Sequence, residues 1–425
     1  MRHLVSKKKG SRLCVCAVAS GALRTAAILA SVALAAVPSS ARALNNDTVL
    51  LRASAGVTYD SNVLGVSNEI PPTLVEQLLG GRSEGAWIFN YGAGVRCDLP
   101  VSRQRFQLDL SATRYDYTQY NELNYTGYAG RGIWDWRAGN DWWGQINAGV
   151  AQTRQTYSSG LAVNVPALVK NYDALADAHY ALTPRWELNG GLTATQARYS
   201  ATALQTGDLN VWTERLGALY RSPLGNGTGL RVTFEQGEWP NLPPVGVAAL
   251  DNTYTQYTLS MVVDWRLSGR SQLSGDIGYT ARIRTAVGKS RTVEGPSGRL
   301  TYTYSLSGKS QLQASLYQTF GPIDDPTASY VKTTGLDLGY SLQATAKIAL
   351  QATASLQKID YLGESLIPGA LQRSDTYSIW GLGARYQATR TLSFSAGAQY
   401  QNRNSNIPLA AYDVYTVYLN ATIEF

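Results

Sequence analysis

Apolar and polar residues alternate along most of the chain, which is the pattern of β-strands with one apolar and one polar face. The final stretch shows it clearly, because Tyr415, Val417 and Leu419 share one face whereas Thr416 and Asn420 lie on the other. No long stretch has a convincing 3.6-residue period. The pattern therefore predicts an all-β protein.

The segments between the predicted strands alternate between short turns and longer loops. Two short turns are near copies of each other, LSGRSQL from residue 267 and LSGKSQL from residue 306. The longer loops are expected near residues 60–84, 118–124, 158–168, 200–208, 239–250, 285–291, 321–328, 361–371 and 402–411. Eight short turns and nine longer loops separate 18 strands, with 16 as the alternative count. This order predicts a transmembrane antiparallel up-and-down β-barrel.

A soluble β-sandwich could also alternate, but two features favour the membrane barrel. Strands of roughly 10 to 15 residues exceed the usual length and suit a tilted membrane crossing. Aromatic residues also collect near strand ends, as at Trp134, Trp136 and Trp142, where outward-facing rings would form interfacial girdles. The terminal Phe425 matches the aromatic C-terminus that the barrel-insertion machinery reads in outer-membrane barrels.

The first 43 residues have the parts of a secretory signal. A basic region with Lys7, Lys8 and Lys9 precedes an apolar stretch, and Ala41 and Ala43 suit the cleavage pocket of a signal peptidase. The apolar stretch is shorter than the roughly 20 residues of a spanning helix, although a retained anchor is the alternative. We expect a removed segment at 1–43, a barrel domain at 44–425, and export to the outer membrane of a Gram-negative bacterium.

The charge balance changes when this segment is set aside. The whole chain has 37 Lys and Arg, 30 Asp and Glu, and a formal net charge of +7. All seven excess cations lie within 1–43, which holds no acidic residue, so the remainder is formally neutral. Neutrality gives no support for nucleic-acid binding. Cys97 is the only cysteine in that remainder and is expected to face lipid.

A short motif at the end of the first predicted strand is similar to one in a known family. The strand runs into Tyr59, Asp60, Ser61 and Asn62, and a long loop follows. Such a leading strand, the long loop and a barrel ending on an aromatic residue resemble the EpsL-like outer-membrane proteins of exopolysaccharide operons. The resemblance implies a role in assembling or exporting an extracellular polysaccharide beside an inner-membrane synthesis complex. The continuation at 64–66, Leu-Gly-Val, departs from the bulkier or basic one usual in the family.

The polar faces of the strands predict what lines the lumen, which is wide enough for water in a barrel of this size. The candidate lumen-lining residues are Arg96, Asp98, Asp109, Arg131, Asp135, Arg137, Asp173, Asp177, His179, Arg231, Asp276, Arg282 and Arg284, joined by Arg52, Arg215, Glu235, Asp264, Arg266, Asp337 and Arg385. Both signs are interspersed, unlike the cationic constriction of a phosphate-selective pore. The pattern predicts a polar conduit for a neutral or weakly charged solute; alternatively, the Arg–Asp pairs only stabilise the wall.

Aromatic residues on the polar faces are candidates for sugar contacts, because the C–H faces of pyranose rings are apolar. Alternation places Tyr115, Tyr117, Trp143 and Tyr317 there, although girdle or loop-packing roles are the alternative. The long first loop holds an apolar run at 74–79 that could form one short helix, with the loop folded inward, covering the rim, or simply exposed.

Catalytic and metal sites find little support in the sequence. His179 shares a strand face with Asp173 and Asp177, but no serine at a nucleophile elbow accompanies it. One cysteine and one histidine do not make a zinc cluster, and no cofactor is expected.

The sequence as a whole predicts a non-enzymatic, porin-like outer-membrane barrel that gives a polar passage in exopolysaccharide biosynthesis or export. The expected partners are outer-membrane lipid, the barrel-insertion machinery, a polysaccharide and an envelope-spanning synthesis or export complex. Two alternatives remain open, a general small-solute diffusion porin and a non-conducting barrel that organises polysaccharide machinery.

Overall fold

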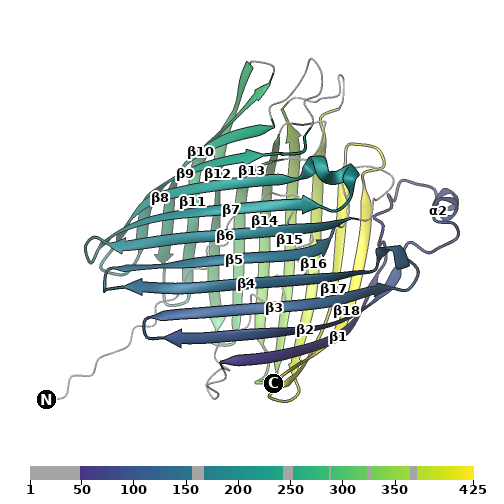
Figure 1. Ribbon diagram of the computed structural model, residues 1–425, viewed down its shortest axis with the longest axis horizontal. Helices are drawn as coiled ribbons and strands as arrows, with labels where there is room; N and C mark the ends of the chain where they lie inside the picture. Colours follow the sequence, from purple (N-terminus) through teal and green to yellow (C-terminus); the bar gives the residue numbers. More distant parts are fainter. Residues whose placement is uncertain are drawn as a thin grey trace.

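The computed structural model describes residues 48–155, 167–242, 252–286, 289–322, 328, 330–363 and 371–425. The signal segment expected at 1–43 lies outside the described residues. The described chain forms one closed sheet of 18 antiparallel strands (Figure 1). The strands are β1 (Val49–Asp60), β2 (Ala86–Val101), β3 (Gln104–Tyr117), β4 (Tyr125–Ala138), β5 (Trp142–Arg154), β6 (Leu168–Ala181), β7 (Trp186–Tyr199), β8 (Leu209–Arg221), β9 (Gly227–Glu238), β10 (Thr253–Arg266), β11 (Ser271–Ala286), β12 (Lys289–Ser307), β13 (Ser310–Gly321), β14 (Tyr330–Gln343), β15 (Ile348–Leu362), β16 (Ser374–Gln387), β17 (Leu392–Ser405) and β18 (Tyr412–Glu424). Short helical segments are α2 (Pro72–Leu78), η3 (Asn121–Leu123) and η4 (Thr202–Gly207).

Each strand pairs with its neighbours in the chain, and β1 also pairs with β18, which closes the barrel. At this closure Arg52 lies opposite Glu424 and Asp60 lies opposite Thr416. The prediction of an all-β, up-and-down barrel of 18 strands is confirmed. A closed antiparallel barrel with an even number of strands is the architecture of bacterial outer-membrane proteins.

The outer surface of the barrel is apolar over its middle, as the alternation predicts. Outward side chains such as Phe89, Leu230, Leu316 and Leu382 are each more than half exposed, with Leu382 at 68%. Such a belt is costly in water and stable in lipid, because it leaves large apolar side chains uncovered all around the barrel. The register places Cys97 on this outward face, opposite Leu108.

Outward aromatic residues form two girdles near the ends of the strands. Toward the short turns, the ring centroids of Phe106 and Trp134 lie 5.7 Å apart, and those of Trp142 and Tyr180 lie 4.5 Å apart. Toward the long loops, Tyr59 contacts both Trp87 and Tyr415 with centroids 5.1 and 5.9 Å apart. Aromatic rings at two levels mark the two interfaces of a bilayer, so the belt between them spans the membrane.

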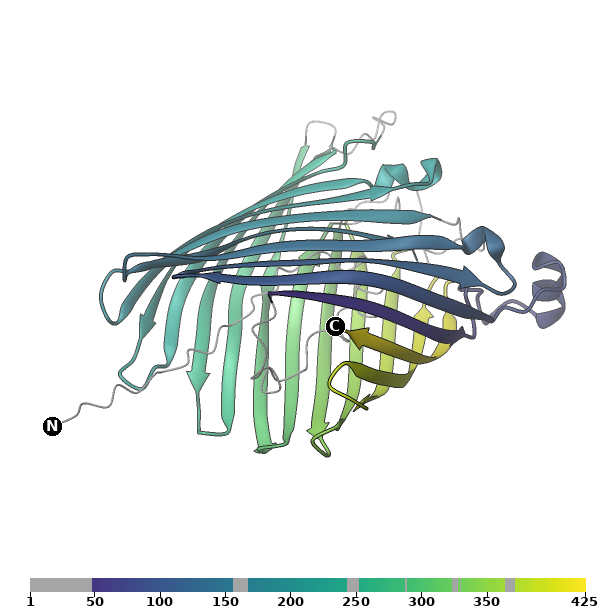
Figure 2. The same ribbon diagram turned by 60° about the horizontal axis from the view of Figure 1, so that its bottom comes forward.

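The strands are long and strongly tilted. They run from 12 residues in β1 to 19 in β12, against a membrane crossing of roughly 10 residues. The blue strands of one wall therefore cross the green and yellow strands of the other at a steep angle in Figures 1 and 2. Tilt of this kind is required to close a sheet into a barrel.

One predicted loop is wrong. The sequence predicts a long loop near 285–291, but β11 extends to Ala286 and β12 begins at Lys289, and these two residues lie opposite each other. Two glycines in these strands have backbone conformations that other residues rarely adopt, with φ 141° at Gly275 and φ 149° at Gly298. A Cβ atom on Gly275 would lie 1.9 Å from the carbonyl oxygen of Arg299, so no other residue fits there without displacement.

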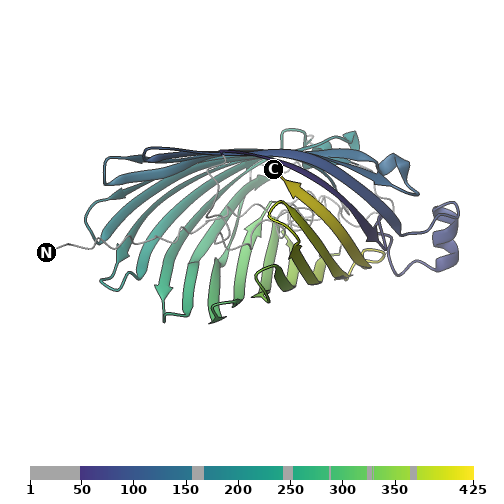
Figure 3. The same cartoon turned by 90° about the horizontal axis from the view of Figure 1, so that it is seen from below.

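The first long loop projects beyond the end of the barrel. It carries α2, which packs Val75 and Leu79 against Ile70 and leaves Leu74 and Leu78 exposed. Figure 3 shows α2 beside the long-loop rim and not inside the barrel. The helix predicted in this loop is confirmed, and the described part of the loop does not form an inward constriction. No helix among the described residues is long and apolar enough to cross a membrane.

Candidate functional site: the inner wall of the barrel

The register places all of the predicted lumen-lining residues on the face opposite the apolar belt. At the first strands, the Arg52 and Arg96 guanidinium groups both contact the Asp109 carboxylate, at 3.1 and 2.7 Å. On the neighbouring strands Arg131 pairs with Asp173 at 3.1 Å. These charges are therefore largely neutralised along the wall by cross-strand pairs.

A second set of charged residues crosses β8, β9, β11, β12 and β14. Arg299 pairs with Asp337 at 3.1 Å, and Asp276 interacts electrostatically with Arg231, Arg215 and Arg299. All five are inward-facing and partly accessible to water. Three arginines and two aspartates are mixed in this set, so side chains of both charges line this part of the wall.

The remaining predicted charges also face inward, but nearer the strand ends. The Arg105 and Asp98 side chains form an ion pair near the short turns, and Asp135 accepts a hydrogen bond from Gln145 at 2.8 Å. Toward the long loops, Arg282 is buried over the ring of Tyr254, 3.9 Å from its centroid, and contacts Glu235 at 3.3 Å. Arg137, Arg266, Arg284 and Arg385 also lie at inward positions of their strands.

His179 is held in place by two carboxylates and an aromatic ring. Its Nδ1 atom lies 2.7 Å from the Glu187 carboxylate, which also accepts a hydrogen bond from Arg221 at 3.0 Å. Its Nε2 atom lies 3.7 Å from Asp177, and its ring stacks on Trp143. Among the described residues no group of His, Cys, Asp and Glu has the arrangement of a metal site.

The four aromatic residues proposed for sugar contacts face inward, but each is already covered by another group. Tyr115 stacks on Tyr125 with centroids 4.7 Å apart, and Trp143 stacks on His179 at 5.5 Å. Tyr117 is 8% exposed and lies under Arg154, while Tyr317 is 3% exposed and lies under Arg299. A sugar ring would have to displace these partners to stack there.

A buried ionic cluster lies on the inner side near the long loops, and the sequence did not predict it. Asp375 is fully buried and accepts hydrogen bonds from Arg373, with a shortest distance of 2.8 Å. The Arg403 guanidinium lies 3.0 Å from the same carboxylate, and both arginines are also buried. The only sequence signal for its inward position is that Asp375 shares a strand face with Tyr377 and Ile379.

The motif at Tyr59 to Asn62 ties the first loop to the last strand. The Asp60 carboxylate accepts a hydrogen bond from the backbone N–H of Asn62 at 2.8 Å. The Asn62 side chain donates to the carbonyl oxygens of Val66 and Asp413, and the Ser61 hydroxyl accepts from the N–H of Tyr415. The motif therefore stabilises the loop at the seam between β1 and β18, which is a structural role.

The same loop is also tied to the next one. The Arg82 guanidinium hydrogen-bonds the Glu122 carboxylate at 2.6 Å and so holds the pKa of that carboxyl below its usual value. The Tyr120 side chain is fully buried beneath this pair and donates to the carbonyl oxygen of Ser83 at 2.6 Å. The rim around the first two long loops is consequently well packed.

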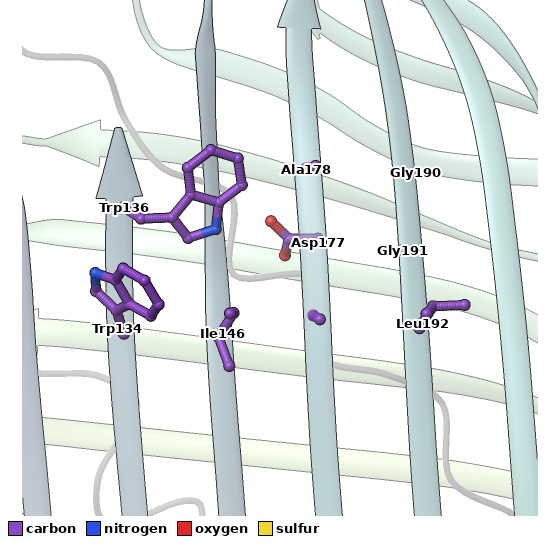
Figure 4. Close-up of a pocket in the computed structure, with 9 residues that line it drawn as sticks. Trp134, Trp136, Ile146, Asp177, Ala178, Gly190, Gly191 and Leu192 are labelled. Carbon is purple, nitrogen blue, oxygen red and sulfur yellow. The ribbon is translucent and has the colours of Figure 1, made fainter. Parts of the chain in front are cut away.

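An apolar groove of about 400 Å³ lies on the outer side of β4 to β7. Figure 4 shows Trp134, Trp136, Ile146 and Leu192 around it, with small residues between them. The large apolar residues of its lining point outward, toward lipid. The groove is therefore not part of a path for a polar solute.

Comparison with known proteins finds similarity only among solved structures. No family model and no curated protein matches the sequence. OpdK from Pseudomonas aeruginosa with vanillate is 10% identical, with 89% of this chain and 99% of that chain covered and a TM-score of 0.45. OccAB3 from Acinetobacter baumannii is 12% identical, with 90% and 100% covered and a TM-score of 0.47. OccK2 (OpdF) from Pseudomonas aeruginosa in complex with glucuronate is 12% identical, with 89% and 98% covered and a TM-score of 0.45. At this similarity the comparisons identify no solute, and they give no support to the EpsL-like family beyond a barrel.

Proposed function

We propose that this barrel is a passive pore for small polar solutes. The observation that carries the proposal is the closed 18-stranded wall, apolar toward lipid and lined inside by charged, amide and hydroxyl side chains that water reaches. A wall of this kind lowers the cost of moving a polar molecule across the hydrocarbon region, because the solute keeps water and polar groups around it. No chemical step is needed.

Single-channel recording tests the proposal directly. The purified full chain is inserted into a planar bilayer, and discrete conductance steps in potassium chloride are expected. Uptake of small neutral sugars by liposomes that contain the protein should agree with the recordings. A correctly folded, inserted barrel without any conductance would contradict the pore and favour a non-conducting scaffold.

The charges on the inner wall should set a weak ion preference. Replacing Arg231 with glutamate changes the local charge by two units beside Arg215 and Asp276. We expect the permeability ratio of potassium to chloride to rise about twofold at ~0.1 M salt, where charges ~10 Å away are only partly screened. The reversal potential under a salt gradient measures this ratio, and Glu214→Gln on the outer face is the matched control. An unchanged ratio would contradict a lumen path past Arg231.

A second candidate function is passage of a polysaccharide during exopolysaccharide biosynthesis or export. The resemblance at residues 59–62 and the mixed-sign inner wall support it. On this hypothesis an envelope-spanning complex delivers the polymer to the short-turn end. Deleting the gene should then abolish surface polysaccharide, and a normal level in a strain without a compensating barrel would count against this role.

A further inference from the structure

The inner wall is not uniform around the barrel. Charged residues line the middle of β4 to β14, including the set formed by Arg215, Arg231, Asp276, Arg299 and Asp337. The middle of β15 to β18 presents only uncharged inward residues between the Arg403 level and the Arg385 level. These include Gln351, Thr353, Ser355, Gln357, Ile379, Gly381, Gly383, Ser395, Gly397, Gln399, Gln401, Val414, Thr416, Tyr418 and Asn420. One side of the lumen is therefore neutral.

Two glycines on the neutral side shape the wall around Tyr418. Gly383 lies opposite Gly397 in the register, and Gly397 lies opposite Tyr418. A Cβ atom on Gly397 would lie 2.7 Å from ring atoms of Tyr418, and one on Gly383 would lie 3.6 Å from its hydroxyl oxygen. The ring therefore lies across both glycines, flat against the wall, with its other face directed to the lumen.

The free face of Tyr418 distinguishes it from the aromatic residues predicted from the sequence. The side chain is half-buried, as expected for a ring with one covered face. No aromatic or cationic group stacks on it among the described residues, whereas Tyr115, Trp143 and Tyr317 each carry such a partner. The protein thus leaves one lumen-facing ring available for stacking at this level.

Uncharged hydrogen-bonding groups flank the ring. Asn420 follows two positions along the same strand, and Gln399 lies on the neighbouring strand opposite Thr416. A Cβ on Gly56 would meet the Asn420 amide oxygen, so this side chain also lies along the wall. A flat aromatic face beside amide groups is the combination that binds a pyranose, because C–H groups stack on the ring and hydroxyl groups bond the amides.

We propose that Tyr418, with Gln399 and Asn420, forms a binding platform for an uncharged carbohydrate in the lumen. This inference rests on the proposed pore function, because the sugar reaches the ring only through the lumen. The preferred solute is then a neutral sugar. The contact is made by Tyr418, which has a free face, and not by the four covered aromatic residues.

The test measures block of the open channel by maltohexaose in planar bilayers. The matched variants are Tyr418→Phe, which keeps a flat ring, and Tyr418→Leu, which covers the glycines with a similar volume but has no flat face. We expect the half-blocking concentration to rise about threefold to tenfold for Tyr418→Leu and to stay within twofold for Tyr418→Phe. The open-channel conductance without sugar reports the pore function separately.

Three outcomes would overturn the platform. Equal block of both Tyr418 variants and the wild type would show that the ring does not contact sugar. A loss of block in Tyr115→Ala but not in Tyr418→Leu would move the contact to the other wall. If the barrel does not conduct, calorimetric titration of the detergent-solubilised chain with maltohexaose gives the same comparison, and equal affinity of Tyr418→Leu and wild type would again contradict the proposal.

Discussion

Replacing Asp375 with asparagine is expected to lower the free energy of unfolding by about 3–5 kcal/mol, because it leaves buried arginines without their carboxylate. Arg373 and Arg403 are 5% and 3% exposed, and Asp375 is completely buried between them. Neither guanidinium can reach bulk water in the folded barrel. Urea unfolding of the variant in lipid vesicles, followed by tryptophan fluorescence, measures the change.

The control for this variant is an exposed ion pair of the same chemistry between the first two long loops. The Arg82 guanidinium and the Glu122 carboxylate lie 2.6 Å apart with side chains 43% and 50% exposed. Glu122→Gln should lower the free energy of unfolding far less than Asp375→Asn, because water screens an exposed pair. Similar losses in the two variants would show that burial of the Asp375 cluster contributes nothing beyond an ordinary surface pair.

Replacing Gly275 with alanine is expected to destabilise the barrel by about 3 kcal/mol or more and to lower the yield of folded protein. Two effects combine at this position. Its φ of 141° is outside the range that side chains tolerate, and the new Cβ would meet the Arg299 carbonyl oxygen at 1.9 Å. Heat-dependent loss of the compact band on a gel reports the folded fraction.

Gly132→Ala is the matched control, since Gly132 is also outward-facing and a Cβ there meets nothing within 4 Å. This variant should fold as well as the wild type, because a strand position without crowding accepts alanine readily. Normal folding of Gly275→Ala would mean that β11 and β12 relax at little cost, contrary to the close approach of their backbones.

The sequence could predict the strands because lipid and water impose different chemistry on alternate residues. Val417, Leu419 and Ala421 face lipid while Thr416, Asn420 and Thr422 face inward, and this alternation alone identifies the strand. The loop predicted near 285–291 was too long for a physical reason. Thr285 pairs with Ser290 and Ala286 pairs with Lys289, and this pairing depends on the register of two strands and not on the residues of the turn alone.

Alternation along a strand predicts which inner-wall residues face the lumen, but it does not predict which residues they contact. The inward positions of charged residues such as Arg131 and Asp173 follow from the alternation along each strand. The Asp375 cluster does not, because its partners come from the neighbouring strand β17 and from the loop before β16. The exposed ring of Tyr418 was also not predictable from its own strand. Its ring lies against Gly383 and Gly397 on two other strands, and only the register between the strands brings these residues together.

The seam between β1 and β18 has a consequence for the order of folding. Phe425 and Leu51 exchange both backbone hydrogen bonds, at 2.7 and 2.9 Å, although almost the whole described chain lies between them. Contacts so distant in sequence carry the greatest loop-closure entropy and form slowly. Until they form, two strand edges expose unpaired N–H and C=O groups that hydrocarbon does not tolerate. Pairing of β1 with β18 therefore satisfies the last two strand edges, and it is the event that completes the barrel.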